Sequence, residues 1–150
     1  MPIPPLDNHG LLPQGICDCS LTEIQNAFCQ NAHRRSLFDG LINFLSAEWY
    51  PHGIDAPILI DGSFVRGTLS PEDIDLVLDV TGRSDRDIVI ALGLYFRREE
   101  LKQLYKVDVL PRHQMMPNDL GSFFQYIGDK AAAELRLDPK HPKGILRIQT

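Results

Sequence analysis

The sequence predicts an α+β protein in which helices flank a small mixed sheet. The first observation is size, because 150 residues with 43% hydrophobic content are enough for a single core. The second is the order of local patterns, which runs helix, strand, turn, strand, helix, strand through the middle of the chain. The third is the C-terminal part, where a helical stretch precedes another short strand pattern. Residues 1–150 are therefore predicted to form one domain.

The predicted local structure of the N-terminal part changes from extended to helical near residue 20. Residues 1–19 contain several prolines and show no hydrophobic periodicity, which predicts an extended arm. The sequence Ser20-Leu-Thr-Glu23 has the spacing of a capping box, in which both side chains accept backbone N–H groups. A helix is therefore predicted from Ser20 to about Cys29, at the start of a helical segment that spans 20–50.

A second helix is predicted over 33–48. Its apolar residues recur at helical spacing, namely Leu37, Leu41, Phe44 and Leu45. Arg34 and Arg35 begin this helix and are expected to face solvent, as charged side chains usually do. Pro51 and Gly53 then end it, because both residues disfavour a continuing helix.

The central segment, residues 57–110, contains the predicted core of the sheet. Short apolar runs next to turn residues predict its strands, and apolar residues at helical spacing predict its long helix. The predicted elements are a strand over 58–61, a helical turn over 63–67, a strand over 73–80, a helix over 85–103 and a strand over 107–110. Pro111 is expected to end the last strand, because proline has no N–H for the ladder.

The C-terminal segment, residues 117–150, is predicted to be helical and to end in a late strand. Asp119 is a candidate N-cap, Ala131–Leu137 favour a helix, and 144–148 has a strand pattern. Three aromatic residues here are candidates for stacking on a nucleobase, although packing in the core is the commoner role of such side chains. They are Phe123, Phe124 and Tyr126.

Two carboxylates lie on one face of the predicted strand 73–80. Alternate residues of a strand share a face, so Asp73 and Asp75 project together, away from the apolar residues between and after them. Close carboxylates repel each other unless a proton or a cation lies between them. Mg²⁺ binds one or two carboxylates together with water and phosphate oxygens. The pair therefore predicts a site for Mg²⁺ (or Mn²⁺), whereas Asp79, farther along this face, is expected to be solvated.

A Gly-Ser turn precedes this strand and suits a phosphate group. Gly62 lets the backbone approach a ligand closely, and Ser63 offers a hydroxyl at the start of a helical turn whose amides can bind an anion. Ser63 is also a candidate N-cap of that turn. Arg66 adds a planar cation, and the sequence leaves open whether it contacts phosphate or forms a surface ion pair.

A third carboxylate, Asp108, lies between Val107 and Val109 in the last predicted strand of the central segment. Two-metal phosphoryl transfer uses ions roughly 3.5–4 Å apart, which stabilise the attacking and leaving oxygens. Asp108 is therefore a candidate ligand of a second ion or a candidate base. The alternative is an aspartate that faces solvent.

In this order and spacing, these residues resemble the nucleotidyltransferase superfamily of polymerase-β type. Its pattern is an apolar strand with Gly-Gly or Gly-Ser, then Asp-x-Asp or Asp-x-Glu on a second strand, then a carboxylate on a third. The Gly-Ser-x-x-Arg-Gly form of Gly62–Gly67 is similar to minimal nucleotidyltransferases of bacterial toxin–antitoxin and resistance systems. Residues 1–13, 118–127 and 143–147 also resemble an uncharacterised group of short bacterial proteins with this core.

The resemblance implies a nucleotidyltransferase-like domain and an enzyme. The implied reaction is Mg²⁺-dependent transfer of a nucleoside monophosphate from an NTP to a hydroxyl of a protein or RNA. The implied catalytic residues and metal ligands are Asp73, Asp75 and Asp108, and the implied nucleotide-binding residues are Gly62, Ser63 and Arg66. The acceptor is left open between a toxin or effector protein and a tRNA. The alternative is a catalytically silent, antitoxin-like protein that binds nucleotide and an effector.

Charge and composition limit the binding partners and the cellular location that we expect for the protein. A net charge of −5 argues against general binding to DNA or RNA backbones, which relies on clustered Lys and Arg. No apolar run approaches the roughly 20 residues that cross a bilayer, and the start lacks the pattern of a signal peptide, so a cytoplasmic protein is expected. Cys17, Cys19 and Cys29 match no common zinc-finger spacing and are expected to be idle thiols, with a zinc site as the alternative.

Overall fold

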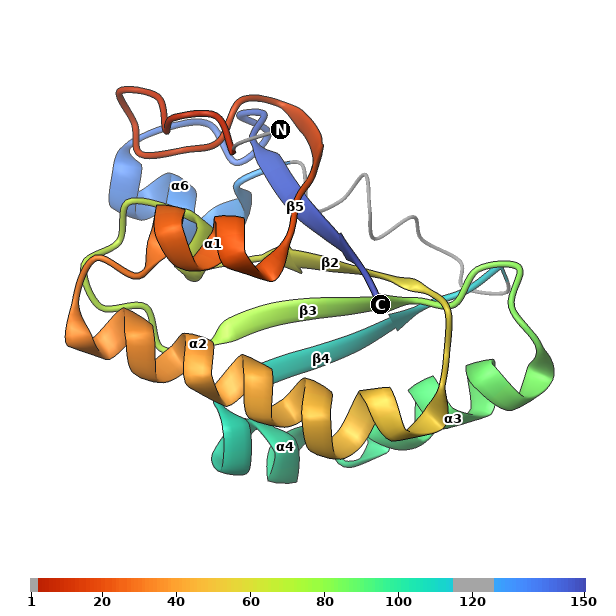
Figure 1. The fold of residues 1–150 in the computed structure, drawn as a ribbon. Helices are drawn as coiled ribbons and strands as arrows, with labels where there is room; N and C mark the ends of the chain where they lie inside the picture. Colours follow the sequence, from red (N-terminus) through yellow and green to blue (C-terminus); the bar gives the residue numbers. More distant parts are fainter. Residues whose placement is uncertain (1–2, 115–125) are drawn as a thin grey trace.

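A five-stranded mixed sheet forms the centre of the protein in the computed structural model (Figure 1). The structure describes residues 3–114 and 126–150. The strands are β1 (Gly15–Asp18), β2 (Pro57–Asp61), β3 (Ile74–Asp79), β4 (Val107–Arg112) and β5 (Gly144–Gln149). Their order is β1-β5-β2-β3-β4, with β1 parallel to β5, β3 parallel to β4, and β2 antiparallel to both neighbours. The predicted α+β class with a small mixed sheet is confirmed.

Helices pack around this sheet in two groups (Figure 1). The helices are α1 (Leu21–Phe28), α2 (Ala32–Phe44), α3 (Asp85–Phe96), α4 (Arg98–Tyr105) and α6 (Gly128–Leu135). Residues of α1 to α4 share the main core with the sheet, whereas α6 packs against Leu11 of the N-terminal segment. Within the described residues, none of the helices combines the length and apolar character that crossing a membrane requires.

The main core fixes which face of β3 carries polar residues. Ile74, Leu76 and Leu78 are fully buried in this core, next to large buried side chains such as Phe44 and Trp49. Burying one such side chain contributes roughly 1.5–3 kcal/mol, so turning β3 over would be strongly unfavourable. The predicted alternation of β3 is confirmed, and its intervening residues face the other side of the sheet.

The predicted helices of the N-terminal half are confirmed, with one extension. The Ser20 hydroxyl accepts the N–H of Glu23, and the Glu23 carboxylate accepts the N–H of Ser20, so the capping box is formed. The second helix begins at Ala32 and continues beyond α2 through a π-helical turn over Leu45–Trp49 and a 3-10 turn over Tyr50–His52. Gly53 then adopts a left-handed conformation that ends the helix.

Two boundaries in the central segment differ from the prediction. The helix expected over 85–103 is divided at Arg97, which has non-helical dihedrals and whose side chain contacts Glu48 and Glu100 at 2.7 and 2.9 Å. No glycine or proline marks this break, so it is not predictable from local sequence. The last strand continues through Pro111, because β4 is an edge strand in which a missing N–H is tolerated.

Residues 3–19, within the arm that was predicted to be extended, pack against the rest of the fold. Leu11 is fully buried, and the N–H of Gly67 donates to the Gly10 carbonyl at 2.9 Å. Gly15–Asp18 forms β1, which pairs in parallel with β5. Among residues 3–19 only the adjacent Leu11 and Leu12 are buried, and β1 is short and half-exposed, so no periodicity arises.

The helix and the late strand predicted for the C-terminal segment are confirmed within residues 126–150. α6 lies within the predicted helical segment, and the late strand is present as β5, between β1 and β2. Tyr126 is half-exposed and pairs with Pro142 in an isolated bridge. The candidate cap Asp119 and the aromatic residues Phe123 and Phe124 lie outside the described residues.

Arg34 is buried, which corrects the expectation that it faces solvent; its neighbour Arg35 is exposed as predicted. The Arg34 guanidinium donates to the carbonyls of Phe64 and Arg66, at 2.6 and 2.7 Å, and also to the Thr68 carbonyl. These carbonyls belong to the loop that follows β2. One side chain of α2 therefore holds the shape of the loop that contains the Gly-Ser turn.

Replacing Arg34 should destabilise the protein because buried carbonyls lose their hydrogen-bond partners. We expect Arg34→Met to lower the free energy of unfolding by about 3 kcal/mol, since each buried unsatisfied group costs about 1–3 kcal/mol. Urea unfolding measures the change. Arg35→Met is the matched control and should change stability by less than about 0.5 kcal/mol. Equal losses in the two variants would contradict this role of Arg34.

Candidate acidic site beside the Gly-Ser turn

Three neighbouring strands bring carboxylates together on the face of the sheet opposite the main core. Asp75 of β3 lies directly across from Asp61 of β2 on one side and from Asp108 of β4 on the other. Directly opposed residues have Cβ atoms about 4.5–5.5 Å apart, so the three side chains form a row. Asp73, immediately before β3, adds a fourth carboxylate at one end of this row.

Three of these acids have the spacing of a metal site. Asp73, Asp75 and Asp108 each offer an oxygen atom, and the three atoms lie within 4.8 Å of one another. Across residues 3–114 and 126–150, this is the one group of His, Cys, Asp or Glu side chains with such spacing. The structure therefore brings the three sequence-predicted acids together, and the cysteines do not join a comparable group within those ranges.

Asp75 has the most perturbed environment in this group. Burial raises the pKa of Asp75 to about 7, and the neighbouring charges of Asp73, Asp108 and Asp61 act in the same direction. The ammonium group of Lys143 opposes the shift. The ionised form of such a carboxylate is disfavoured at neutral pH, and a nearby divalent cation would stabilise it.

Gly62 makes this arrangement sterically feasible. Its φ is +82°, and a Cβ atom at this position would lie 2.3 Å from Asp75 Oδ2. Only glycine therefore allows the Asp75 carboxylate to rest against the turn. Gly62 is also the N-cap residue of the 3-10 turn Ser63–Val65, which forms without a side-chain cap hydrogen bond. The expectation that Ser63 caps this turn was wrong, because Ser63 is already its first residue.

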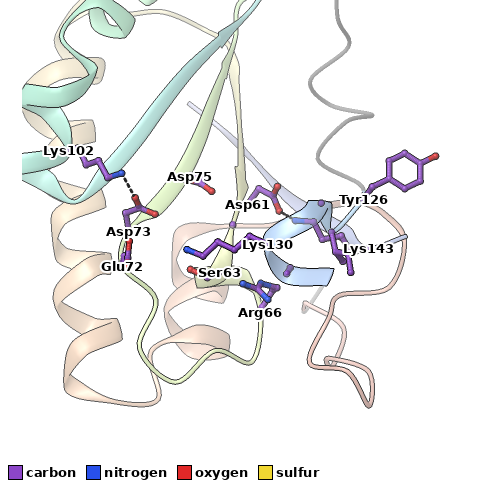
Figure 2. Close-up of a pocket in the computed structure, with 14 residues that line it drawn as sticks. Asp61, Ser63, Arg66, Glu72, Asp73, Asp75, Lys102, Tyr126, Lys130 and Lys143 are labelled. Carbon is purple, nitrogen blue, oxygen red and sulfur yellow. Dashed lines mark hydrogen bonds and ion pairs between the residues drawn. The ribbon is translucent and has the colours of Figure 1, made fainter. Parts of the chain in front are cut away.

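Cationic side chains surround the acids (Figure 2). Lys143, which precedes β5, forms a buried ion pair with Asp61, and Lys102 of α4 lies 3.2 Å from Asp73. Burial raises the pKa of Asp61, while the Lys143 ammonium opposes that shift. Sequence reasoning missed Asp61 and Lys143 because they are 82 positions apart, and only the pairing of β2 with β5 brings them together.

Asp108 has a separate partner. Arg98, the first residue of α4, donates from Nε to Asp108 Oδ1 at 2.5 Å and from a terminal nitrogen to Asp108 Oδ2 at 3.0 Å. Both carboxylate oxygens are therefore bound by one guanidinium. This pair is not predictable from local sequence, because Arg98 lies in a run of charged residues that is typical of a solvated helix face.

A cavity of about 330 Å³ opens beside the acids. Asp61, Asp73 and Asp75 contribute to its lining, and Asp108 does not. The Gly-Ser turn forms another part of the wall, and the remaining charged lining residues are Arg66, Glu72, Lys102, Lys130 and Lys143. Figure 2 shows the side chains of Lys130 and Lys143 extending from the α6 side toward the acids.

Arg66 is nearly buried and lies 3.5 Å from Glu134 of α6. The ion pair that the sequence left open is therefore formed, although its partner is on a distant helix. Arg66 also lines the cavity, so contact with a phosphate group stays a prediction. Lys130, which sequence reasoning did not single out, lines the same cavity from the first turn of α6.

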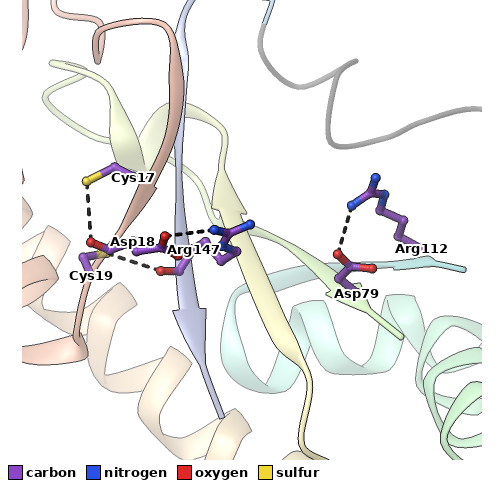
Figure 3. Close-up of polar contacts among 6 residues, drawn as sticks. All are labelled: Cys17, Asp18, Cys19, Asp79, Arg112 and Arg147. Carbon is purple, nitrogen blue, oxygen red and sulfur yellow. Dashed lines mark hydrogen bonds and ion pairs between the residues drawn. The ribbon is translucent and has the colours of Figure 1, made fainter. Parts of the chain in front are cut away.

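Farther along the same face, acids pair with arginines (Figure 3). Asp79 is 2.9 Å from Arg112, which corrects the expectation that Asp79 is solvated. Arg147 binds both oxygens of Asp18, at 2.6 and 2.8 Å. These pairs neutralise the sheet face away from the cavity.

The thiols near β1 have no sign of reactivity. Burial raises the pKa of Cys19 to about 12 and also raises the pKa of Cys17 and Cys29. The thiols of Cys17 and Cys19 each lie near a backbone carbonyl, at 3.8 and 3.9 Å (Figure 3). Protonated thiols are poor nucleophiles and poor metal ligands, which favours the idle-thiol interpretation.

Comparison with protein families gives one match. Residues 4–149 match DUF6932, a family of unknown function. No curated protein and no solved structure matches the chain. These comparisons therefore assign no chemistry to the site.

Replacing Gly62 should damage the site more than replacing a glycine in open space. We expect Gly62→Ala to lower the free energy of unfolding by about 3 kcal/mol, because a strained backbone and a clash with Asp75 add together. Gly82→Ala is the matched control: Gly82 has φ +72° but no atom near the added Cβ, so only about 1 kcal/mol of strain is expected. Urea unfolding gives both values, and equal losses would contradict the close approach of Asp75.

The pKa of Asp75 should make the metal-free protein less stable as pH rises. Native Asp75 keeps its proton up to about pH 7, whereas the unfolded chain loses it near pH 4, so stability should fall between these values. The expected slope from this group is about 1 kcal/mol per pH unit. Urea unfolding across this range in a chelator measures it. Asp75→Asn should remove that slope, and identical slopes in both proteins would contradict the shift.

Proposed function

The chain belongs to the DUF6932 family, and we propose that it is a nucleotidyltransferase. With Mg²⁺ (or Mn²⁺), it would transfer a nucleoside monophosphate from an NTP to a hydroxyl of a protein or RNA and release pyrophosphate. The observation that carries the proposal is the convergence of Asp73, Asp75 and Asp108 beside the turn at Gly62. The same three acids and the same turn underlie the resemblance to the polymerase-β type of nucleotidyltransferase.

The acids fit a hard divalent cation. Three carboxylate oxygens within 4.8 Å are suitable donors for Mg²⁺, and burial and the neighbouring carboxylates, which raise the pKa of Asp75, are effects that a bound cation would offset. Asp73 and Asp75 would hold the ion, because both line the cavity. When bound, Mg²⁺ polarises phosphoryl oxygens and neutralises charge that develops on them.

The cavity suits the phosphates of an NTP. The first amides of the Ser63–Val65 turn and the Ser63 hydroxyl are available as donors on one wall. Arg66, Lys130 and Lys143 add positive charge to the cavity lining. Such groups would orient the triphosphate and balance its charge. Catalysis of phosphoryl transfer depends mainly on positioning and electrostatics of this kind.

The acceptor is proposed to be a hydroxyl of a toxin or effector protein or of a tRNA. The net charge of −5 favours a protein, because binding to nucleic acid backbones relies on clustered cations. A cytoplasmic location is part of this proposal.

A second candidate is a binding protein without turnover, such as an antitoxin-like partner of an effector. The observation in its favour is that Asp73, Asp108 and Asp61 already have cationic partners: Lys102, Arg98 and Lys143 respectively. A site that is partly neutralised by its own side chains can persist without metal-dependent chemistry. Nucleotide binding would then be the activity that remains.

Transfer activity should depend on the acids at the cavity. We expect purified protein with Mg²⁺ and each of four α-labelled NTPs, alone and with lysate of its own cells, to label a protein or RNA. Asp73→Asn and Asp75→Asn should each lower the labelling by about a hundredfold or more, because charge stabilisation is lost. Asp79→Asn is the matched control, since Asp79 is on the same strand face but outside the cavity.

The labelling experiment also separates the two candidates. Labelling that persists in both acid variants would overturn the proposed enzyme. Absence of labelling, together with a rise in melting temperature on adding Mg²⁺ and NTP, would favour the binding protein, because a ligand specific for the folded state stabilises it.

A further inference from the structure

We propose that Arg98 limits the acidic site to one divalent ion in the absence of substrate, by occupying Asp108. The inference rests on the proposed function, because it takes the acids as a metal site. The cluster of acids alone does not determine how many ions it binds. Arg98 acts here as a positioning residue through Asp108.

The contact between Arg98 and Asp108 uses all of the carboxylate. Each Asp108 oxygen accepts a hydrogen bond from a different guanidinium nitrogen, at 2.5 and 3.0 Å. Two parallel charge-assisted hydrogen bonds are stronger and more directional than a single contact. An ion that approaches Asp108 must therefore displace a bidentate partner.

Asp73 differs from Asp108 in its cationic partner and in its access to the cavity. Its cationic partner Lys102 makes a single contact at 3.2 Å, which is weaker than the two hydrogen bonds of Arg98. Asp73 and Asp75 line the cavity, whereas Asp108 does not. A first ion can thus reach Asp73 and Asp75 from the cavity while the Arg98 contact stays intact.

The surrounding structure fixes Arg98 in place. The guanidinium lies 5.9 Å from the centre of the Tyr95 ring, a cation–π distance. The adjacent residue Arg97 interrupts the helix and is held by Glu48 and Glu100, so α4 begins at Arg98. The first side chain of α4 is therefore the one that contacts Asp108 of β4. The helix division that the sequence did not predict therefore positions the residue that binds Asp108.

Charge balance leads to the same stoichiometry. One divalent ion, Arg98 and Lys102 together supply four positive charges beside the three carboxylates of the metal site. Asp61 is already balanced by Lys143. A second ion would raise the positive charge further above that of the three carboxylates, until a triphosphate brings further negative charge.

Isothermal titration with Mn²⁺ alone, without nucleotide, tests the inference. We expect wild-type protein to bind one Mn²⁺ per chain, and Arg98→Gln to bind a second ion at least about tenfold more tightly than wild type does. Arg112→Gln is the matched control, because Arg112 also pairs with an aspartate on this sheet face but outside the acids of the metal site. It should bind Mn²⁺ as wild type does.

A second variant separates the loss of the bidentate contact from the loss of positive charge at position 98. Arg98→Lys keeps the charge but cannot form the bidentate contact, so its second site should be intermediate in affinity. Melting curves must show that all variants are folded. Two equivalent ions in wild type, or one ion in both wild type and Arg98→Gln, would overturn the role of Arg98 and leave the metal site standing. No Mn²⁺ bound by any of the proteins would overturn the metal site itself, and with it the proposed function.

Discussion

The close approach of the Asp75 carboxylate to the backbone of Gly62 is the contact on which the site depends. It requires a residue without Cβ, because an added Cβ would lie 2.3 Å from the carboxylate oxygen. It also requires the β2–β3 register that sets Asp75 opposite Asp61. Both conditions confine an ionisable group to a half-buried place, which raises its pKa and makes a nearby positive charge favourable. The turn and the strand are therefore one structural unit.

Distant parts of the chain support this unit from three sides. Arg34 of α2 binds the carbonyls of the loop after the turn, Lys143 before β5 pairs with Asp61, and Arg98 of α4 pairs with Asp108. Arg34 and Lys143 are buried cations, which are favourable only where they are fully paired, so their contacts also specify how α2 and β5 dock. The N-terminal arm adds a backbone hydrogen bond to the same loop through Gly67. The fold thus surrounds the candidate site with contacts that are long-range in sequence.

Local sequence predicted the elements and the central motif well. The capping box at Ser20-Leu-Thr-Glu23, the alternation in β3 and the apolar face of α2 each arise from interactions within a few residues, where propensity and periodicity apply. The spacing of Gly62, Asp73 and Asp75 is likewise a local pattern, so the sequence identified two of the acids at the cavity but not Asp61. Predictions failed where a side chain has a tertiary partner, as for Arg34 and Asp79.

The sequence by itself determined the α+β class, most helices and strands, and the residue types of the acidic site. Only the tertiary structure decided that β5 inserts beside β2, that Lys143 therefore meets Asp61, and that the division of the long helix at Arg97 directs Arg98 to Asp108. The physical reason is distance along the chain. Strand order and helix docking depend on which buried surfaces and charges fit together in space, and no periodicity within a short window records that fit.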